Sequence, residues 1–267
     1  MTGEQKAVKI FALVLAGIIC LSIFSAIMSG LSWMISWTDD SYRVGETSTE
    51  TINSKEIDRL KIDLGASNLE IYRGPEFKIE KENVRGKVTI NTVGSTLKIE
   101  EKSHTFWNNR VGGTIVVYIS SDVELSMLDI DMGAGTVTME DIEADEFDFD
   151  QGAGTLYMDK CKFDKTNIDG GVGKTTIKNS TLRNLDLDSG VGSIDIEAKI
   201  LGNSSIEGGV GSIRLEILGS KEDYTLTTEK GIGSITVDGE KSEGQRGNRA
   251  NSLRVDGGVG SIQIDFH

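Results

Sequence analysis

The sequence predicts an all-β protein: a single-domain β-solenoid built from 19-residue repeats and preceded by one N-terminal transmembrane helix. Three observations predict this architecture. A Gly-x-Gly motif recurs at a constant interval, apolar and polar residues alternate around each motif, and a long segment near the N-terminus carries no charge. The expected organisation is a cytoplasmic tail at residues 1–9, a transmembrane helix at 10–37, a linker at 38–55 and an extracytoplasmic repeat domain at 56–267.

The N-terminal segment 10–37 contains no charged residue. A helix needs about 20 apolar residues to cross a bilayer, and a longer run leaves room for tilt. Lys6 and Lys9 precede the segment, whereas Asp39 and Asp40 follow it. Basic flanks stay cytoplasmic, so we expect a single-pass cell-membrane protein with a cytoplasmic N-terminus and an extracytoplasmic bulk. The alternative, a cleaved signal peptide, would have an apolar stretch of only about 7–15 residues.

The Gly-x-Gly motif is the strongest signal in the chain. The first glycines are Gly133, Gly152, Gly171, Gly190, Gly209, Gly231 and Gly258. Four successive intervals are 19 residues long, and the last two are 22 and 27. Self-similarity at a fixed period is the signature of a repeat architecture. Glycine tolerates positive φ and close backbone approach, so we interpret the motif as the corner of each repeat.

Apolar residues occupy fixed places around each corner. They stand three residues before the first glycine, and four and six residues after it, with polar residues between, as in Val137-Thr138-Met139. This period-two alternation predicts half-buried strands. Each repeat is thus a strand, a Gly-x-Gly turn and a second strand, stacked about 4.8 Å from the next. Leu60 to Ile71 fits the same pattern, Val88, Ile90, Leu97 and Ile99 resemble a coil without the first glycine, and Gly112 to Ile119 is a further strand.

A carboxylate stands two residues before the first glycine of every repeat. These residues are Asp131, Asp150, Asp169, Asp188, Glu207, Glu229 and Asp256, with Asp63 in the early copy. Stacked coils would place them about 5 Å apart, where like charges repel. One interpretation is an Asx-turn, in which each side chain accepts hydrogen bonds from its own turn.

The other interpretation of the acidic column is calcium binding, because Ca²⁺ takes clustered carboxylate oxygens. The candidate ligands are Asp131, Asp150, Asp169, Asp188, Glu207 and Asp256. Calcium-binding nonapeptide solenoids carry an Asp two residues after Gly-Gly-x-Gly, and that Asp is missing here: Thr175 and Ile213 hold the place. We therefore favour the Asx-turn and assign no metal site.

Other chemistry finds little support in the sequence. The segment 170–176 resembles a phosphate loop, but Ile168 stands where that loop needs glycine and the same turn recurs in later repeats, so no cofactor is expected. The histidines, His104 and His267, lack metal-ligand spacing. Cys20 and Cys161 cannot plausibly pair. The net charge of −14 disfavours nucleic acid as a partner.

Three segments carry a family resemblance. Val116 to Ile119, Leu128 to Gly135 and the repeated Gly-x-Gly-Ser-Ile units resemble the bacterial "putative adhesin" family of β-strand-repeat proteins, to which LiaG-like cell-envelope proteins are similar. The resemblance covers roughly residues 60–267. It implies a β-repeat domain behind a membrane anchor, with no established catalytic activity and no family site residues to transfer.

The expected function is therefore non-enzymatic interaction with a cell-envelope protein or glycan, in adhesion or in the envelope stress response. One alternative is a self-assembling surface scaffold, because open strand edges pair and the segment 261–267 is a strand without a polar cap, which predicts end-to-end homo-oligomers. A polysaccharide-active enzyme is a weaker alternative, since it needs two carboxylates in unlike environments and repetition makes these equivalent. The insertion 238–252 is expected to be a mobile surface loop.

Overall fold

The computed structural model describes residues 46–53, 56–84, 86–102, 112–241, 243–247 and 249–267, all of them within one compact unit, Val44–His267. The predicted transmembrane segment 10–37 lies outside these residues, as do Cys20 and His104. Among the residues described, no helix has the length and apolar character needed to cross a membrane.

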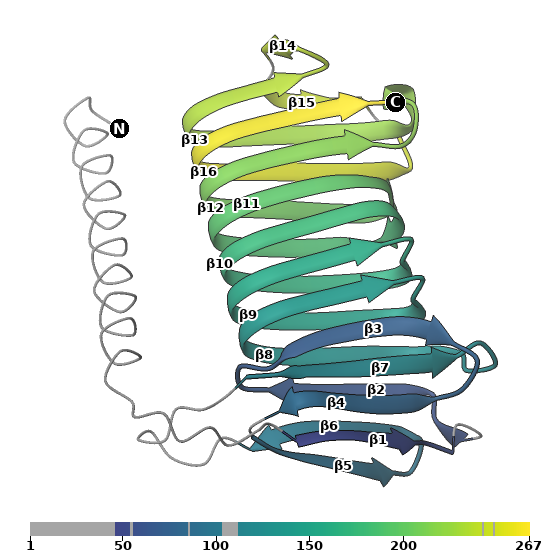
Figure 1. Ribbon diagram of the computed structural model, residues 1–267. Helices are drawn as coiled ribbons and strands as arrows, with labels where there is room; N and C mark the ends of the chain where they lie inside the picture. The colour runs from purple at the N-terminus through teal and green to yellow at the C-terminus, as the bar shows by residue number, and fades with distance from the viewer. Residues whose placement is uncertain (1–45, 54–55, 85, 103–111, 242, 248) are drawn as a thin grey trace, which may run out of the picture. The chain divides into compact units, whose positions relative to one another are not determined.

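Seven long strands form the regular part of the fold: β8 (Leu125–Glu140), β9 (Glu143–Asp159), β10 (Lys162–Arg183), β11 (Leu185–Leu201), β12 (Asn203–Ile217), β13 (Tyr224–Val237) and β16 (Asn251–Phe266). Each strand bends at its Gly-x-Gly motif and makes most of one coil (Figure 1). Neighbouring coils are parallel, and Gly154, Gly173, Gly192 and Gly211 pair in succession. The predicted all-β fold with coils stacked in register at 19-residue intervals is confirmed.

The core is a set of rows that run along the stack. The three predicted apolar rows are buried almost throughout, for example Ile168, Leu187 and Ile206. A fourth row, five residues before the first glycine, was not predicted. Its members, all buried, are Leu128, Phe147, Thr166, Leu185, Ser204, Leu226 and Leu253. Because Thr166 and Ser204 are polar, a search for apolar residues alone does not detect this row.

Each coil also has a third side, which the sequence analysis did not predict. A residue with positive φ, such as Asp141 (59°), Lys160 (54°) or Asn179 (49°), turns the chain after the second strand. A short segment then returns to the next coil and pairs in parallel with its neighbour, as Phe163 does with Ala144. The coil therefore has three walls rather than two.

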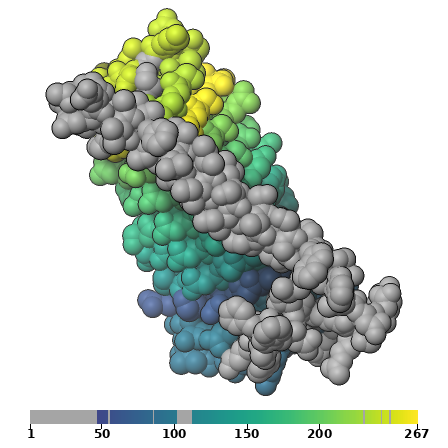
Figure 2. Space-filling model, turned by 90° about the vertical axis from the view of Figure 1, so that its left-hand side faces the viewer, coloured from purple at the N-terminus to yellow at the C-terminus, as the bar shows by residue number. Residues whose placement is uncertain are grey.

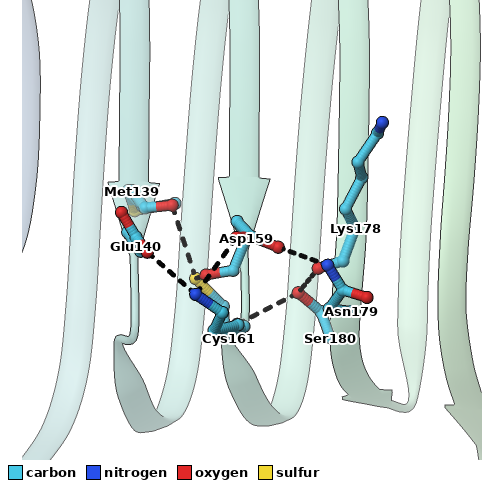
Figure 3. Close-up of polar contacts among 8 residues, drawn as sticks. Met139, Glu140, Asp159, Cys161, Lys178, Asn179 and Ser180 are labelled. Atoms are coloured by element: carbon cyan, nitrogen blue, oxygen red, sulfur yellow. Dashed lines mark hydrogen bonds and ion pairs between the residues drawn. The ribbon is translucent and has the colours of Figure 1, made fainter.

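Cys161 lies on this third side (Figure 3). Its backbone N–H donates to the Ser180 Oγ at 3.0 Å, and its Sγ lies 3.5 Å from the Asp159 carbonyl oxygen. Burial raises the pKa of the thiol to about 12. Since the thiolate is the reactive form, this cysteine is a core residue.

The N-terminal strands build on the first coil. β2 (Arg59–Leu64) and β3 (Asn68–Gly74) pair in parallel with β8, as predicted for Leu60 to Ile71. β6 (Thr96–Lys102) pairs in parallel with β2, and β7 (Thr114–Ser120) pairs in parallel with β3, so these strands extend the two walls. β5 (Lys87–Val93) pairs with β6, β4 (Lys78–Val84) with β7 and β1 (Glu46–Thr51) with β4, all antiparallel. β1 falls within the predicted linker 38–55 and extends the folded unit toward the N-terminus.

One early prediction was wrong. Val88 and Ile90 do not share a coil with Leu97 and Ile99, because Ile90 faces Ile99 across an antiparallel hairpin. The turn of this hairpin contains Gly94, whose φ is +62°. Alternation alone does not distinguish a hairpin from a parallel coil, since both strands alternate with period two.

The C-terminal coils are not stacked in chain order. β16 lies between β12 and β13 and pairs in parallel with both, and in Figure 2 the yellow β16 separates the green β12 from the yellow-green β13. A short 3-10 helix (Lys221–Asp223) joins β12 to β13. The other edge of β13 is partly covered by β14 (Glu240–Lys241) and β15 (Gly244–Arg246).

This order corrects two expectations. The strand in 261–267 does not form an open end of the solenoid, because β16 is paired on both sides. The insertion 238–252 is not simply a surface loop, because β14 and β15 within it pair with β13. The premise for end-to-end pairing through the last strand is therefore wrong, although the oligomeric state itself stays a prediction.

Candidate functional site

The corner glycines are required by backbone packing. A Cβ on any of the seven first glycines would lie 2.1–2.7 Å from a carbonyl oxygen of the neighbouring coil. The second glycines have φ of 140–156°, and a Cβ on Gly173 would lie 1.8 Å from the Gly154 carbonyl oxygen. Real Cβ contacts are never so short, so both roles inferred for the glycines, positive φ and close approach, occur at the same corner.

The predicted carboxylates form one continuous row beside these corners. The ladder pairs Asp63 with Asp131, and then Asp131, Asp150, Asp169, Asp188 and Glu207 follow one coil after another. In the C-terminal coils Asp256 comes before Glu229, because β16 precedes β13 in space. Sequence reasoning found these eight members, but it missed Glu100, which pairs with Asp63 and extends the row onto β6.

A second acidic row lies on the same face of the coils and was not predicted. It stands two residues earlier in β8, β9 and β11, because alternate residues of a strand share a face, and it ends at Ser205 of β12. Asp129 and Asp148 pair in it, then Asn167 interrupts the row before Asp186. The repeated Asp-x-Asp motif, as in Asp186-Leu187-Asp188, is the sequence signal that could have revealed this row.

The carboxylate row lines an open groove. The groove has a volume of about 710 Å³ and is lined by Asp63, Asp131, Asp150, Asp169, Asp188 and Glu207 together with the first glycines of their coils. The corner is hollow because those glycines have no side chains to fill it. Its length, over six coils, suits an extended ligand better than a compact one.

The Asx-turn interpretation was wrong. In the described part of the chain, no carboxylate of the row accepts a hydrogen bond from its own turn. The turn N–H groups instead bond to the neighbouring coil, as the Ala134 N–H does to the Gly65 carbonyl oxygen at 2.9 Å. Parallel stacking therefore uses the donors that an Asx-turn would need, and the carboxylates are left to face the groove.

One corner does hold a carboxylate in its turn, and it belongs to a residue that the sequence did not single out. Glu101 is only 7% exposed and accepts hydrogen bonds from the backbone N–H groups of Gly65, Ala66 and Ser67 at 3.0–3.2 Å. It also accepts the Ser67 hydroxyl at 2.7 Å. The Glu101 carboxylate therefore satisfies the backbone N–H groups of this corner, which in a later coil bond to carbonyl oxygens, as the Ala134 N–H does to Gly65.

Cations pair with carboxylates toward the two ends of the row but not in its middle. Lys61 pairs with Asp129 and lies 3.5 Å from Asp131, whereas Arg254 pairs with Asp256 at 2.7 Å. For the described residues, no ion pair reaches Asp150, Asp169 or Asp188. Elsewhere the coils place cations beside carboxylates of the adjacent coil, as in the pairs of Lys160 with Glu140 and Lys165 with Glu146.

The pKa values reflect this crowding. Partial burial, followed by the charges of Asp169 and Asp131, raises the pKa of Asp150. Burial also raises the pKa of Asp188, with Asp186 and Asp169 as the next causes. The charged forms of Asp150 and Asp188 are therefore disfavoured, and a cationic partner would remove that cost.

The calcium candidates lie in a row rather than around a point. Within the residues that the structure describes, no three His, Cys, Asp or Glu side chains converge in a way that could hold a metal ion. His267 is exposed, and its backbone N–H bonds to the Ile217 carbonyl oxygen. The glycine-rich segment 170–176 is part of β10 and forms a corner like the others.

Comparison with known proteins agrees with this architecture. Residues 57–263 match the model of the family described as Toastrack DUF4097. No curated protein sequence matches the chain. Among solved structures, the chain is similar to a Bacteroides fragilis protein described as a "putative adhesin", at 14% identity and a TM-score of 0.54, over 82% of this chain and 97% of that one.

Two further solved structures are similar over most of the chain. A "putative cell adhesion protein" from Clostridium sporogenes has 16% identity and a TM-score of 0.36, covering 83% of this chain and 99% of that one. A "Putative lipid binding protein" from Parabacteroides distasonis has 14% identity and a TM-score of 0.44, covering 82% and 97%. At such identities the likeness concerns the fold alone.

Proposed function

This chain belongs to the Toastrack DUF4097 family, and from that premise we propose that it is a non-catalytic interaction protein of the cell surface whose acidic groove binds an extended cationic partner. The observation that carries the proposal is the run of carboxylates at Asp150, Asp169 and Asp188, which line an open groove and form no ion pair with any described residue. A partner rich in amino or guanidinium groups would meet one carboxylate per coil.

Binding rather than catalysis suits this geometry. General acid–base chemistry on a polysaccharide needs two carboxyl groups with different environments. Here each carboxylate of the groove repeats the surroundings of the last, with a glycine corner on one side and a like charge above and below. A row of equivalent charges instead gives several weak contacts whose combined strength depends on simultaneous engagement.

The test compares two triple variants with the same change in charge. Asp150→Asn, Asp169→Asn and Asp188→Asn together neutralise the middle of the groove. The matched control, Asp145→Asn, Asp195→Asn and Glu197→Gln, removes three carboxylates that do not line it. Binding of a fluorescent lysine-rich peptide to residues 44–267 is measured at low and at physiological salt.

We expect the groove variant to bind at least tenfold more weakly than the control at low salt, with a smaller salt dependence, because exposed charge interactions are screened over about 8–10 Å. Equal loss in the two variants would mean that only net charge matters and would reject the groove. Cells that lack the gene for this protein should attach less well to the surface that the wild-type cells colonise. Normal attachment together with a lost envelope-stress response would favour the stress role over adhesion.

We also propose that residues 10–37 anchor the domain in the cell membrane with the bulk outside. The support is the absence of charge in this segment together with Lys6 and Lys9 before it. Protease added to intact spheroplasts should digest the repeat domain while leaving a cytoplasmic control protein intact. Protection of the domain until the membrane is opened would reject this topology.

A further inference from the structure

We propose that β13 and β16 compete for the same place on β12, so that the C-terminal coils can exchange between the observed order β12–β16–β13 and the chain order β12–β13–β16. The observed order differs from that of β9, β10, β11 and β12, because each of these strands stacks on the coil that precedes it in sequence. Two strands with the same pattern are thus available for one edge.

Both strands meet the steric requirement of the β12 corner. A coil that stacks on β12 must pass over the Gly211 carbonyl oxygen, and a Cβ at Gly260 of β16 would lie only 1.5 Å from that atom. β13 has a glycine, Gly233, at the equivalent place, and the two glycines pair with each other in the ladder. Either strand therefore offers the bare backbone that the corner needs.

Both strands also continue the buried rows of β12. β16 places Ile262 and Ile264 beside Ile213 and Leu215. β13 carries Ile235 and Val237 in register with those same two residues of β16. A direct contact of β13 with β12 would keep an apolar side chain in each row. The interval from the β12 corner to the β13 corner is 22 residues, three more than a coil requires, so the connection is long enough for either place.

The contacts that select the observed order lie at the ends of the strands, outside the repeated rows. The Gly219 N–H donates to the His267 carbonyl oxygen at 2.8 Å, and the Phe266 N–H donates to the Asp238 Oδ1 at 3.1 Å. The rings of Tyr224 and Phe266 lie 5.4 Å apart. β14 and β15 add pairs on the outer edge of β13. During synthesis β13 emerges before β16, so the chain order is available first.

Pairs of engineered cysteines distinguish the two orders in the full chain, with Cys20→Ser as background. Arg254 of β16 lies in register with Ser205 of β12 on one side and with Thr227 of β13 on the other. Ser205 and Thr227 are thus two strand spacings apart, about 9.6 Å, too far for a disulfide, which needs Cα atoms within about 7 Å. Ser205→Cys with Arg254→Cys reports the observed order, and Ser205→Cys with Thr227→Cys reports the chain order.

The decisive variant adds Gly260→Val, which obstructs β16 on β12 and equally on β13, so that the edge of β12 is left to β13. We expect the Ser205–Arg254 cysteine pair to lose most of its cross-linking and the Ser205–Thr227 pair to rise at least fivefold. Gly233→Val is the matched control: its Cβ would lie 1.6 Å from the Gly260 carbonyl oxygen, and it obstructs β13 in either place, so it should not raise the Ser205–Thr227 cross-link.

Asp186→Cys with Ser205→Cys, which are in register between β11 and β12, verifies that the remaining stack is intact in the Gly260→Val background. The proposal is overturned if the Ser205–Thr227 cross-link stays at background while this pair still forms, or if Gly260→Val leaves the Ser205–Arg254 cross-link unchanged. Should the stack itself be lost, refolding of the chain with native glycines decides, because the Ser205–Thr227 cross-link must then appear transiently, and its absence overturns the exchange.

Discussion

Two adjacent glycines at one corner allow the cost of a Cβ against the neighbouring coil to be separated from the other effects of a Gly→Ala substitution. Gly170 and Gly171 lie next to each other, and neither has a φ in the left-handed region. A Cβ on Gly171 would lie 2.3 Å from the Gly152 carbonyl oxygen, whereas a Cβ on Gly170 would lie 3.7 Å from the Asp188 carbonyl oxygen. The two Gly→Ala variants therefore differ mainly in backbone contact.

The cost of Gly171→Ala follows from that distance. Ordinary contact begins at 3.4 Å, so the neighbouring carbonyl must retreat by about 1 Å, which takes a ladder hydrogen bond beyond its usual 2.7–3.2 Å. Overpacking costs about 1–3 kcal/mol and a lost hydrogen bond about 1 kcal/mol. We expect the free energy of unfolding to fall by about 2–4 kcal/mol. Gly170→Ala should be neutral or stabilise by about 0.4–1 kcal/mol, because alanine restricts the unfolded chain.

Equilibrium urea unfolding of residues 44–267, followed by far-ultraviolet circular dichroism, measures both variants. With m-values of about 1–3 kcal/mol/M, the midpoints of the two variants should differ by about 1 M or more. An unchanged m-value is needed, since long repeat arrays can lose cooperativity. If both variants unfold at the same urea concentration, close approach between coils does not explain why glycine recurs at every corner of this chain.

Two other perturbations test the charged groups. Glu101→Ala removes the acceptor for three backbone N–H groups of the corner 65–67; it should cost about 3 kcal/mol, because hydrogen bonds to charged groups contribute about 1.5–3 kcal/mol. Glu101→Gln, which keeps one acceptor oxygen, should cost less in the same urea assay, and an equal cost would contradict the assigned role. The raised pKa values of Asp150 and Asp188 predict stability that is present below their ordinary pKa of 3.8 and lost as the pH rises through the higher folded values. Asp169→Asn removes a like charge next to both groups, so melting temperatures measured across this pH window should vary less than in the wild type; a steeper dependence would refute the repulsion.

Much of the site was readable from the sequence. Every carboxylate of the groove and every corner glycine follows from the repeat interval, because equivalent residues of stacked coils must share a row. The groups that these side chains contact could not be predicted from the sequence. The Asp150 carboxylate faces the groove instead of its own turn, since the neighbouring coil takes the turn N–H groups, and that competition exists only after stacking. Glu101 reaches a turn 34–36 residues away along the chain, with nothing local to mark it.

The order of the C-terminal coils marks the boundary between what the sequence determined and what only the tertiary structure decided. The sequence determined the shape of a coil, because every repeat carries the same strand alternation and the same corner glycines, which allow it to lie against a neighbouring coil. It also marked the irregular end, where the intervals lengthen to 22 and 27 residues. It did not decide which coil lies on which. Parallel stacking in register requires the same residue pattern in every coil, so β13 and β16 each fit β12. The choice between them depends on contacts at the strand ends, which form only once the coils are in place.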